Sequence, residues 1–193
     1  MTKIILATTS PYRREVFGYL GIDFEVERSN VDESQVERNN PEKLVKTLSR
    51  LKAEAVAKNH PDAIVIGMDS VTYFNGQIFE KPKSREEAFQ RLKAFSGNNH
   101  QFYTGIYIIN PILNKAVSRV VKTEVFMRNL SEKEINAYLN EDSNFNTYAL
   151  GYDPIKHISA SFIQRIKGSY YNLLGGIPLE AIVEILKEMK VWT

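Results

Sequence analysis

The stretch from Ala63 to Pro82 constrains the fold more than any other part of the chain. It opens with four apolar residues (63–66), a run too short and too β-branched for a helix, which predicts a strand buried on both faces. We expect Gly67 and Met68 to end this strand, so that Asp69 follows at its carboxyl end. α/β proteins commonly place reactive groups there, because the strand is rigid and the loops beyond it form a crevice.

A β-hairpin is predicted directly after this acid. Asn75-Gly76 separates two β-prone runs, and Asn-Gly is the strongest short hairpin signal because a type I′ turn needs positive φ at both positions. The hairpin returns the chain to Lys81, so a fixed carboxylate and a fixed ammonium would face one cleft. The plainer interpretation stays open: Asp69 caps a turn, and Lys81 is a solvated surface lysine.

A second charged cluster lies at the start of the first predicted helix. Residues 3–7 predict a strand, Ser10 is a good N-cap, and Pro11 suits the first helical position. Arg13 and Arg14 fall in the first turn, where the helix dipole favours anions instead of cations. Paired arginines beside exposed helix N–H groups indicate a bound anion, phosphate above all. Two solvated surface arginines are the alternative.

The remaining elements predict an α/β protein with a mixed β-sheet and flanking helices, forming one domain over residues 1–193. Further helices are expected at residues 41–58, 84–95, 131–140 and from 179 onward. Further strands are expected at 23–27, 101–110, 117–128 and 162–166, the two long ones paired antiparallel. Gly105 in a strand marks a bulge or a close backbone approach. Residues 29–40, 147–158 and 168–172 are expected as loop, irregular chain and turn.

Composition excludes several classes of function. The chain has no cysteine and three scattered histidines, which excludes thiolate chemistry and argues against a zinc hydrolase site. A net charge of +2 gives no drive toward nucleic acid or an anionic membrane. No apolar run approaches the roughly 18 residues of a membrane span, and the N-terminus lacks a signal-peptide pattern. We therefore expect a cytoplasmic protein that binds neither nucleic acid nor membrane.

The charged residues that remain suggest phosphate chemistry. Glu33 lies in a polar loop and needs other acids nearby to hold a metal, and Lys52 is by itself better interpreted as a helix-surface lysine. No Walker A loop, GxGxxG or GxSxG motif is present. Cations with hard oxygen ligands, without sulfur or histidine, suit a magnesium-bound phosphate substrate and its hydrolysis. The candidate set is Arg13, Arg14, Lys52, Lys81, Glu33 and Asp69.

Motifs along most of the chain resemble those of the Maf family. Each motif alone is weak, but their order and spacing match from about residue 3 to about residue 186, which makes the resemblance specific. The matching segments are Thr8–Arg14, Val31–Glu33, Leu51–Ala53, Ile66–Val71, Glu80–Pro82, Leu92–Gly97 with His100, Thr104–Gly105, Leu130–Ser131 with Glu134–Ile135, and Gly168–Tyr171 with Ile177–Leu179.

The resemblance implies a two-lobed α/β fold around a central cleft, related to the inosine triphosphate pyrophosphatases. It implies hydrolysis of modified or non-standard nucleoside triphosphates to the monophosphate and pyrophosphate, with a divalent metal (Mg²⁺, or Mn²⁺ or Co²⁺) and a homodimer. By matching motif positions, it implies catalytic roles for Asp69 (the general base), Lys52 and Lys81, metal binding by Glu33 and Asp69, and substrate binding by Ser10, Tyr12, Arg13, Arg14 and Ser70.

The preferred base stays open. Family members specific for dTTP and UTP carry Ser-Pro-Arg-Arg, whereas this chain has Tyr12 inside that motif. Tyr12 and the segment 102–105 look more like the subgroup acting on 7-methyl-GTP, where an aromatic ring could stack on a cationic base; local packing of Tyr12 is the alternative. Residues 148–154 depart from the family's base-reading motif, where Lys156 is the ungapped counterpart and Asp153 a candidate substitute.

A function of another class is the alternative. The family's name points to septum formation and cell-shape control, so the chain could be a non-catalytic nucleotide-binding or interaction protein. The intact acids and lysines argue against this, because a scaffold has no need of a site for metal and water.

Overall fold

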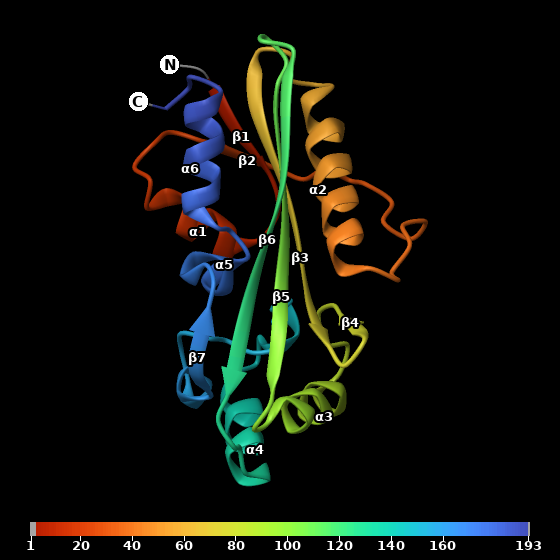
Figure 1. Ribbon diagram of the computed structural model, residues 1–193, viewed down its shortest axis with the longest axis vertical. Helices are drawn as coiled ribbons and strands as arrows, with labels where there is room; N and C mark the ends of the chain where they lie inside the picture. The colour runs from red at the N-terminus through yellow and green to blue at the C-terminus, as the bar shows by residue number, and fades with distance from the viewer. Residues whose placement is uncertain (1–2, 193) are drawn as a thin grey trace.

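The computed structural model describes residues 3–192 and contains a seven-stranded mixed sheet with helices on both faces (Figure 1). The strands are β1 (Lys3–Ala7), β2 (Glu25–Glu27), β3 (Ala63–Phe74), β4 (Gln77–Phe79), β5 (Asn99–Asn110), β6 (Lys115–Met127) and β7 (Ile163–Lys167). The helices are α1 (Pro11–Gly18), α2 (Pro41–Ala57), α3 (Arg85–Phe95), α4 (Glu132–Glu141), α5 (Tyr170–Gly175) and α6 (Leu179–Glu188), with 3-10 turns η1 (Phe145–Thr147) and η2 (Ile158–Ser161).

The sheet has the order β2-β1-β3-β5-β6-β7, with β4 paired to β3 off this path. β1 runs parallel to β2 and β3, and the remaining pairs are antiparallel. The predicted mixed sheet is therefore confirmed, including the long antiparallel pair, which is β5 with β6. None of the helices among residues 3–192 combines the length and the apolar content that a membrane crossing needs.

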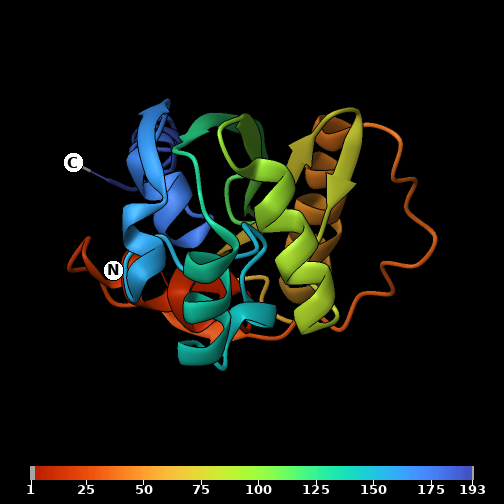
Figure 2. The same cartoon turned by 90° about the horizontal axis from the view of Figure 1, so that it is seen from below.

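Two lobes share the three long strands β3, β5 and β6. In the first lobe, α1 and α6 cover one face of the sheet with a core that includes Phe17, Ile66 and Ile182, and α2 covers the opposite face (Figure 1). The second lobe is built by α3, α4 and the chain around β7, seen from below in Figure 2. Its core includes Phe95 and Tyr138. The two-lobed arrangement implied by the resemblance is present.

The course of β3 differs from the sequence prediction. Gly67 and Met68 do not end the strand, which runs unbroken to Phe74, because β5 pairs with it continuously from Val65 to Tyr73. The hairpin after it is confirmed: Asn75 and Gly76 have φ of 47° and 80°, as a type I′ turn requires. Asp69 thus lies within a strand and not in a loop after one.

Two glycines let α2 lie directly on the sheet. A Cβ on Gly67 would stand 2.2 Å from the carbonyl oxygen of Ser49, and a Cβ on Gly105 would stand 2.2 Å from that of Val45. Gly105 pairs across the ladder with Asp69. The close backbone approach predicted for Gly105 is therefore confirmed, and it brings α2 against the strand that carries Asp69.

Most helix boundaries agree with the sequence prediction, since their caps form as expected. Ser10 accepts a hydrogen bond from the Arg13 amide, and Ser131 forms a capping box with Glu134. The turn predicted at residues 168–172 is wrong, because Ser169 caps the short helix α5 there. Residues 147–158 are irregular apart from short turns, as predicted.

Candidate active site

The candidate site lies beside β3 where one edge of that strand lacks a neighbour. β1 pairs with β3 as far as Gly67 and β4 pairs from Thr72 onward, so within residues 3–192 this edge is unpaired between them. A cavity of about 910 Å³ opens at the gap, and Asp69, Ser70 and Lys81 line it. The site therefore still lies at the carboxyl end of the parallel pair β1–β3, although β3 itself continues.

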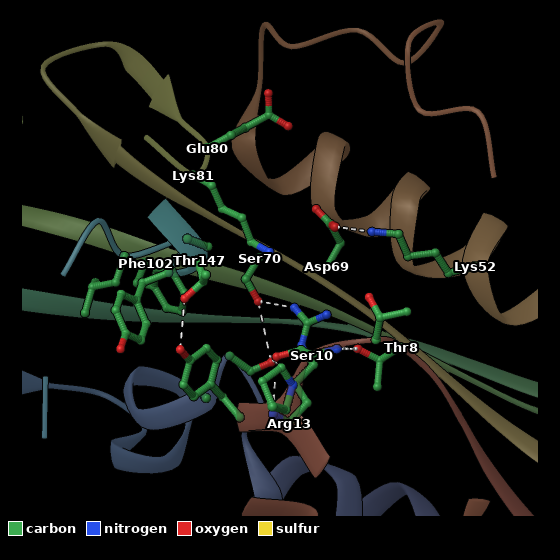
Figure 3. A pocket seen from close by; sticks show the side chains of 18 of the residues that line it. Thr8, Ser10, Arg13, Lys52, Asp69, Ser70, Glu80, Lys81, Phe102 and Thr147 are labelled. Atoms are coloured by element: carbon green, nitrogen blue, oxygen red, sulfur yellow. Dashed lines mark hydrogen bonds and ion pairs between the residues drawn. The ribbon is translucent and has the colours of Figure 1, made fainter. Parts of the chain in front are cut away.

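The alternation of a strand places Asp69 and Ser70 on opposite faces of the sheet. Asp69 shares its face with Gly67, which contacts α2, so Asp69 meets Lys52 of that helix: Nζ donates to Oδ1 at 2.6 Å. The same ammonium lies 2.9 Å from Oε1 of Glu33 in the loop before α2. Asp69 is 9% exposed. One ammonium thus holds two carboxylates together at the end of the cavity (Figure 3 shows Asp69 and Lys52).

Burial and charge act in opposite directions on these groups. Burial raises the pKa of Asp69, and the ammonium of Lys52 and the guanidinium of Arg13 lower it, with burial the larger effect. Loss of water, followed by repulsion from Arg13 and Lys52, lowers the pKa of Lys81. An aspartate with raised proton affinity is a better base near neutral pH.

Arg13 reaches across from α1 to the other face of β3. Its Nε donates to the Gly176 carbonyl at 3.2 Å, Nη1 to the Met68 carbonyl at 3.0 Å, and Nη2 to Ser70 Oγ at 2.8 Å. A guanidinium has five N–H donors, so two remain for a ligand. Gly176 is required here, because a Cβ on it would stand 2.5 Å from Ser70 Oγ.

The start of α1 forms the floor of the cavity beside Arg13. Thr8 Oγ1 accepts the Ser10 amide at 3.1 Å, which shapes the loop that precedes the helix, and both residues line the cavity. In the first turn the Arg13 and Arg14 amides donate to Ser10, which leaves the Tyr12 amide to favour an anion. Arg14, predicted alongside Arg13, is exposed and is not among the residues that line the cavity.

The far end of the cavity is aromatic. Tyr12, Phe102, Tyr148 and Tyr152 line it, and the rings of Tyr12 and Tyr148 lie 4.9 Å apart with a 38° tilt. Figure 3 shows Phe102 and Thr147 on the side away from Asp69 and Lys52, with Lys81 and Ser70 between. The cavity therefore has a charged end suited to phosphates and an aromatic end suited to a planar ring.

The two residues considered as base readers do not face this end. Asp153 is 4% exposed and is absent from the cavity lining, as is Lys156, which is exposed. The Asp153 carboxylate accepts hydrogen bonds from the Tyr148 hydroxyl and from the amides of Ile155 and Lys156.

The donor set fits a divalent metal that arrives with its substrate. Residues 3–192 contain no group of three or more histidine, cysteine, aspartate or glutamate side chains able to hold a metal. Glu33 and Asp69 offer carboxylate oxygens at one place. Mg²⁺ is typically held by one or two carboxylates together with substrate phosphates and water, and this pair offers that number of carboxylates.

Sequence reasoning missed Arg28, which lines the cavity. It follows β2 directly, and β2 runs parallel to β1, so it lies at the same sheet edge as Thr8 and Ser10. Arg28 could have been found from the sequence, because it comes just after the strand predicted at residues 23–27. Tyr148 was missed as a site residue because no periodicity places an irregular segment in space.

Fold and cavity together define a class of protein. It is a two-lobed α/β protein whose sheet leaves a gap between β1 and β4, and the cavity at this gap has charged side chains at one end and aromatic rings at the other. Comparison with known proteins then identifies the family: residues 3–189 match the model described as Maf-like protein, and the chain belongs to that family.

Relatives with assigned activities cover nearly the whole chain. It is 38% identical to the dTTP/UTP pyrophosphatase of Syntrophus aciditrophicus, over 97% of this chain and 90% of that protein. It is 35% identical to the 7-methyl-GTP pyrophosphatase of Nitrosococcus oceani, over 96% and 92%. Among solved structures, a HAM1 protein from Coxiella burnetii is similar in fold, with a TM-score of 0.55 at 15% identity, over 97% of this chain and 100% of that one.

Proposed function

We propose that this protein is a nucleoside triphosphate pyrophosphatase that uses a divalent metal and releases a nucleoside monophosphate and pyrophosphate. The observation that supports it best is the Glu33–Lys52–Asp69 cluster, which lines one cavity together with Arg13. Relatives named as pyrophosphatases for dTTP/UTP and for 7-methyl-GTP support the reaction class.

In this proposal Asp69 is the general base. Lys52 binds its Oδ1, which leaves Oδ2 for a water molecule in the cavity. Asp69 accepts a proton as the water oxygen bonds to the α-phosphorus, the bond from that phosphorus to the bridging oxygen breaks, and pyrophosphate leaves with the bond's electrons. A divalent metal held by Glu33, Asp69 and the phosphates would neutralise the charge on those phosphates.

The cations divide the remaining work. Arg13, the Ser10 hydroxyl and the Tyr12 amide bind phosphate oxygens, with Ser70 fixing the guanidinium of Arg13. Lys81 reaches the middle of the cavity (Figure 3) and stabilises charge on the leaving pyrophosphate. Arg14 is exposed, and its contribution is limited to long-range attraction of the substrate.

The substrates are modified or non-standard nucleoside triphosphates, with 7-methyl-GTP the first candidate because the far end of the cavity is aromatic. A pyrophosphate-release screen over 7-methyl-GTP, GTP, dTTP, UTP and CTP, each with Mg²⁺, Mn²⁺ and Co²⁺, identifies the base and the metal. Relatives carry both dTTP/UTP and 7-methyl-GTP names, so the screen includes both groups.

The decisive variant is Asp69→Asn, which keeps the shape of the side chain and removes its basicity. We expect pyrophosphate release to fall by at least roughly 100-fold while the far-UV spectrum stays unchanged. Asp62→Asn is the control, since Asp62 is exposed outside the cavity. Full activity in Asp69→Asn rejects the assignment. An inactive wild-type protein that captures a specific protein partner favours the non-catalytic role in septum formation.

We also propose a cytoplasmic homodimer. Exposed aromatic side chains gather near α1 and α5, with Tyr19 60% and Tyr170 56% exposed, and aromatic residues are enriched at protein interfaces. Light scattering after size-exclusion chromatography measures the mass of the particle. A mass of one chain at micromolar concentration contradicts the dimer.

A further inference from the structure

Two buried carboxylates lie behind the aromatic end of the cavity, and the hydrolytic step does not use them. Asp142 is 1% exposed and Asp153 is 4% exposed. Within residues 3–192, neither has a lysine or arginine within salt-bridge distance; the nearest cationic group is His157, whose Nε2 lies 3.9 Å from Asp142 Oδ1. Buried acids are rarely left without a basic partner, so their placement here requires a reason.

Both carboxylates only accept hydrogen bonds, from tyrosine hydroxyls and from backbone amides. Asp142 accepts the Tyr138 hydroxyl at 2.7 Å and the Asn144 amide at 2.8 Å. Asp153 accepts the Tyr148 hydroxyl at 3.1 Å and the amides of Ile155 and Lys156 at 2.8 and 3.1 Å. Both groups act only as acceptors in these hydrogen bonds, as carboxylates do. The pair therefore places negative charge behind the cavity wall.

Tyr148 connects this charge to the cavity. Its ring lines the aromatic end and its hydroxyl donates to Asp153. Burial first, then contact with Tyr12 and the charges of Asp153 and Asp142, raise the pKa of Tyr148, so it stays a donor. A phenol that donates to a carboxylate gains electron density on its ring, and an electron-rich ring face attracts cations more strongly.

The neighbouring ring is fixed in the same way. The Tyr12 hydroxyl lies 2.9 Å from Thr147 Oγ1, which itself donates to the Asn144 carbonyl at 2.8 Å. Tyr12 therefore donates to Thr147, and its hydroxyl proton is not available to a base edge. The protons of the Tyr12 and Tyr148 hydroxyls are both used within the protein, which leaves the faces of these two rings for a ligand.

We propose that Asp153, supported by Asp142, determines the specificity of this site by making the aromatic wall select nucleotides whose base carries a positive charge, such as N-alkylated purines. The proposal rests on the proposed nucleotide site. Asp153 acts through Tyr148 as a positioning and charging residue and does not touch the base. His157 offsets part of the charge from outside, since its Nε2 lies 3.9 Å from Asp142 Oδ1, while its Nδ1 lies 3.0 Å from exposed Glu141.

The test compares 7-methyl-GTP, whose base is cationic at mildly acidic pH, with GTP, whose base is neutral. In Asp153→Asn we expect kcat/KM for 7-methyl-GTP to fall about tenfold and that for GTP to stay within about twofold. A merely structural role would lower both substrates together. An unchanged ratio of the two values overturns the proposal.

Two further variants separate the ring from the charge. Tyr148→Phe keeps the ring and loses the bond to Asp153, so we expect a smaller fall in the same ratio. Tyr148→Leu removes the ring face, so we expect the largest fall. Asp62→Asn removes an exposed charge outside the cavity and is expected to leave the ratio unchanged. If the ratio of kcat/KM for 7-methyl-GTP to that for GTP is unchanged in Tyr148→Leu, the aromatic wall does not select the cationic base.

Calorimetric binding of 7-methyl-GMP and GMP to the wild-type protein tests the inference without turnover. Tighter binding of the methylated monophosphate, lost in Asp153→Asn, supports it even if no triphosphate is hydrolysed, in which case the proposed function alone fails. Equal affinities overturn the inference while leaving pyrophosphate release untouched. If Asp153→Asn does not fold, Tyr148→Phe and the wild-type comparison decide.

Discussion

Asp69 carries two opposing influences on its affinity for a proton. Burial raises its pKa, while Lys52 at 2.6 Å is the largest influence in the other direction. A general base needs a pKa high enough to accept a proton and low enough to stay ionised at working pH. In the proposed mechanism Lys52 therefore tunes the pKa of the base, and the direction in which that pKa moves without Lys52 can be predicted.

We expect Lys52→Met to shift the acid limb of the kcat/KM profile to higher pH. Without the ammonium the pKa of Asp69 rises further, so the ionised fraction at a given acidic pH falls and activity falls with it. Pyrophosphate release measured across the pH range checks this. Lys46→Met is the matched control, since Lys46 is exposed on the same helix. An acid limb that stays in place or moves lower contradicts the coupling.

At the scale of elements, the approach of α2 to the sheet depends on glycine. Gly105→Ala would drive a methyl group to 2.2 Å from the Val45 carbonyl oxygen. We expect a loss of about 2–3 kcal/mol in the free energy of unfolding and a fall in activity, because α2 carries Lys52. Gly18→Ala is the control, with no atom within 4 Å of its Cβ. Urea denaturation and pyrophosphate release measure the two effects, and wild-type stability in Gly105→Ala contradicts the packing.

The elements predicted best from the sequence are those with local signals. Ser131 and Glu134 determine where α4 begins, and Asn75-Gly76 determines the hairpin. The end of β3 was predicted wrongly, since the partner that carries it past Gly67 is β5, about 40 residues away in the chain. The length of a strand depends on its pairing with other strands. This pairing belongs to the tertiary structure, so local β-propensity does not predict it.

A buried histidine gives the second lobe a predictable response to acid. His100 is fully buried, stacked 4.2 Å from Phe95, and burial lowers its pKa to about 3. Below pH 6.5 the unfolded chain gains a proton at this residue that the folded chain does not, so stability falls with decreasing pH, by up to about 1.4 kcal/mol per pH unit, until about pH 3.

We expect His100→Phe to remove this contribution, since phenylalanine keeps a planar ring and cannot titrate. Its free energy of unfolding, measured with urea at several values of pH, should depend less on pH than that of the wild type between 6.5 and about 3. His60, near the surface beside Glu27, supplies the comparison variant His60→Phe. Equal slopes for wild type and His100→Phe would mean that the buried ring contributes nothing.

For the whole molecule, the sequence indicated the candidate site residues but not the face of the sheet on which each side chain lies. Asp69 and Ser70 are neighbours in the chain and point to opposite faces, toward Lys52 and Arg13. Both reach one cavity because β1 and β4 leave a gap along β3. The gap is a consequence of topology, which the sequence does not contain. For this reason the sequence predicted Arg13 and Arg14 together as site residues, whereas only Arg13 lines the cavity.

The same topology predicts that the two lobes unfold together. β3, β5 and β6 are 12, 12 and 13 residues long and contribute to the cores of both lobes: Ile66 and Ile106 to one, Phe102 and Val125 to the other. Melting one lobe would fray strands that the other needs, so we expect the chain to unfold as one domain in a single transition. Calorimetry and urea titration followed by far-UV circular dichroism and by fluorescence of Trp192, which packs in the first lobe, check this. Coincident curves with equal calorimetric and van't Hoff enthalpies are the expected outcome, whereas a fluorescence midpoint displaced from the far-UV midpoint would mean that the lobes are separate domains.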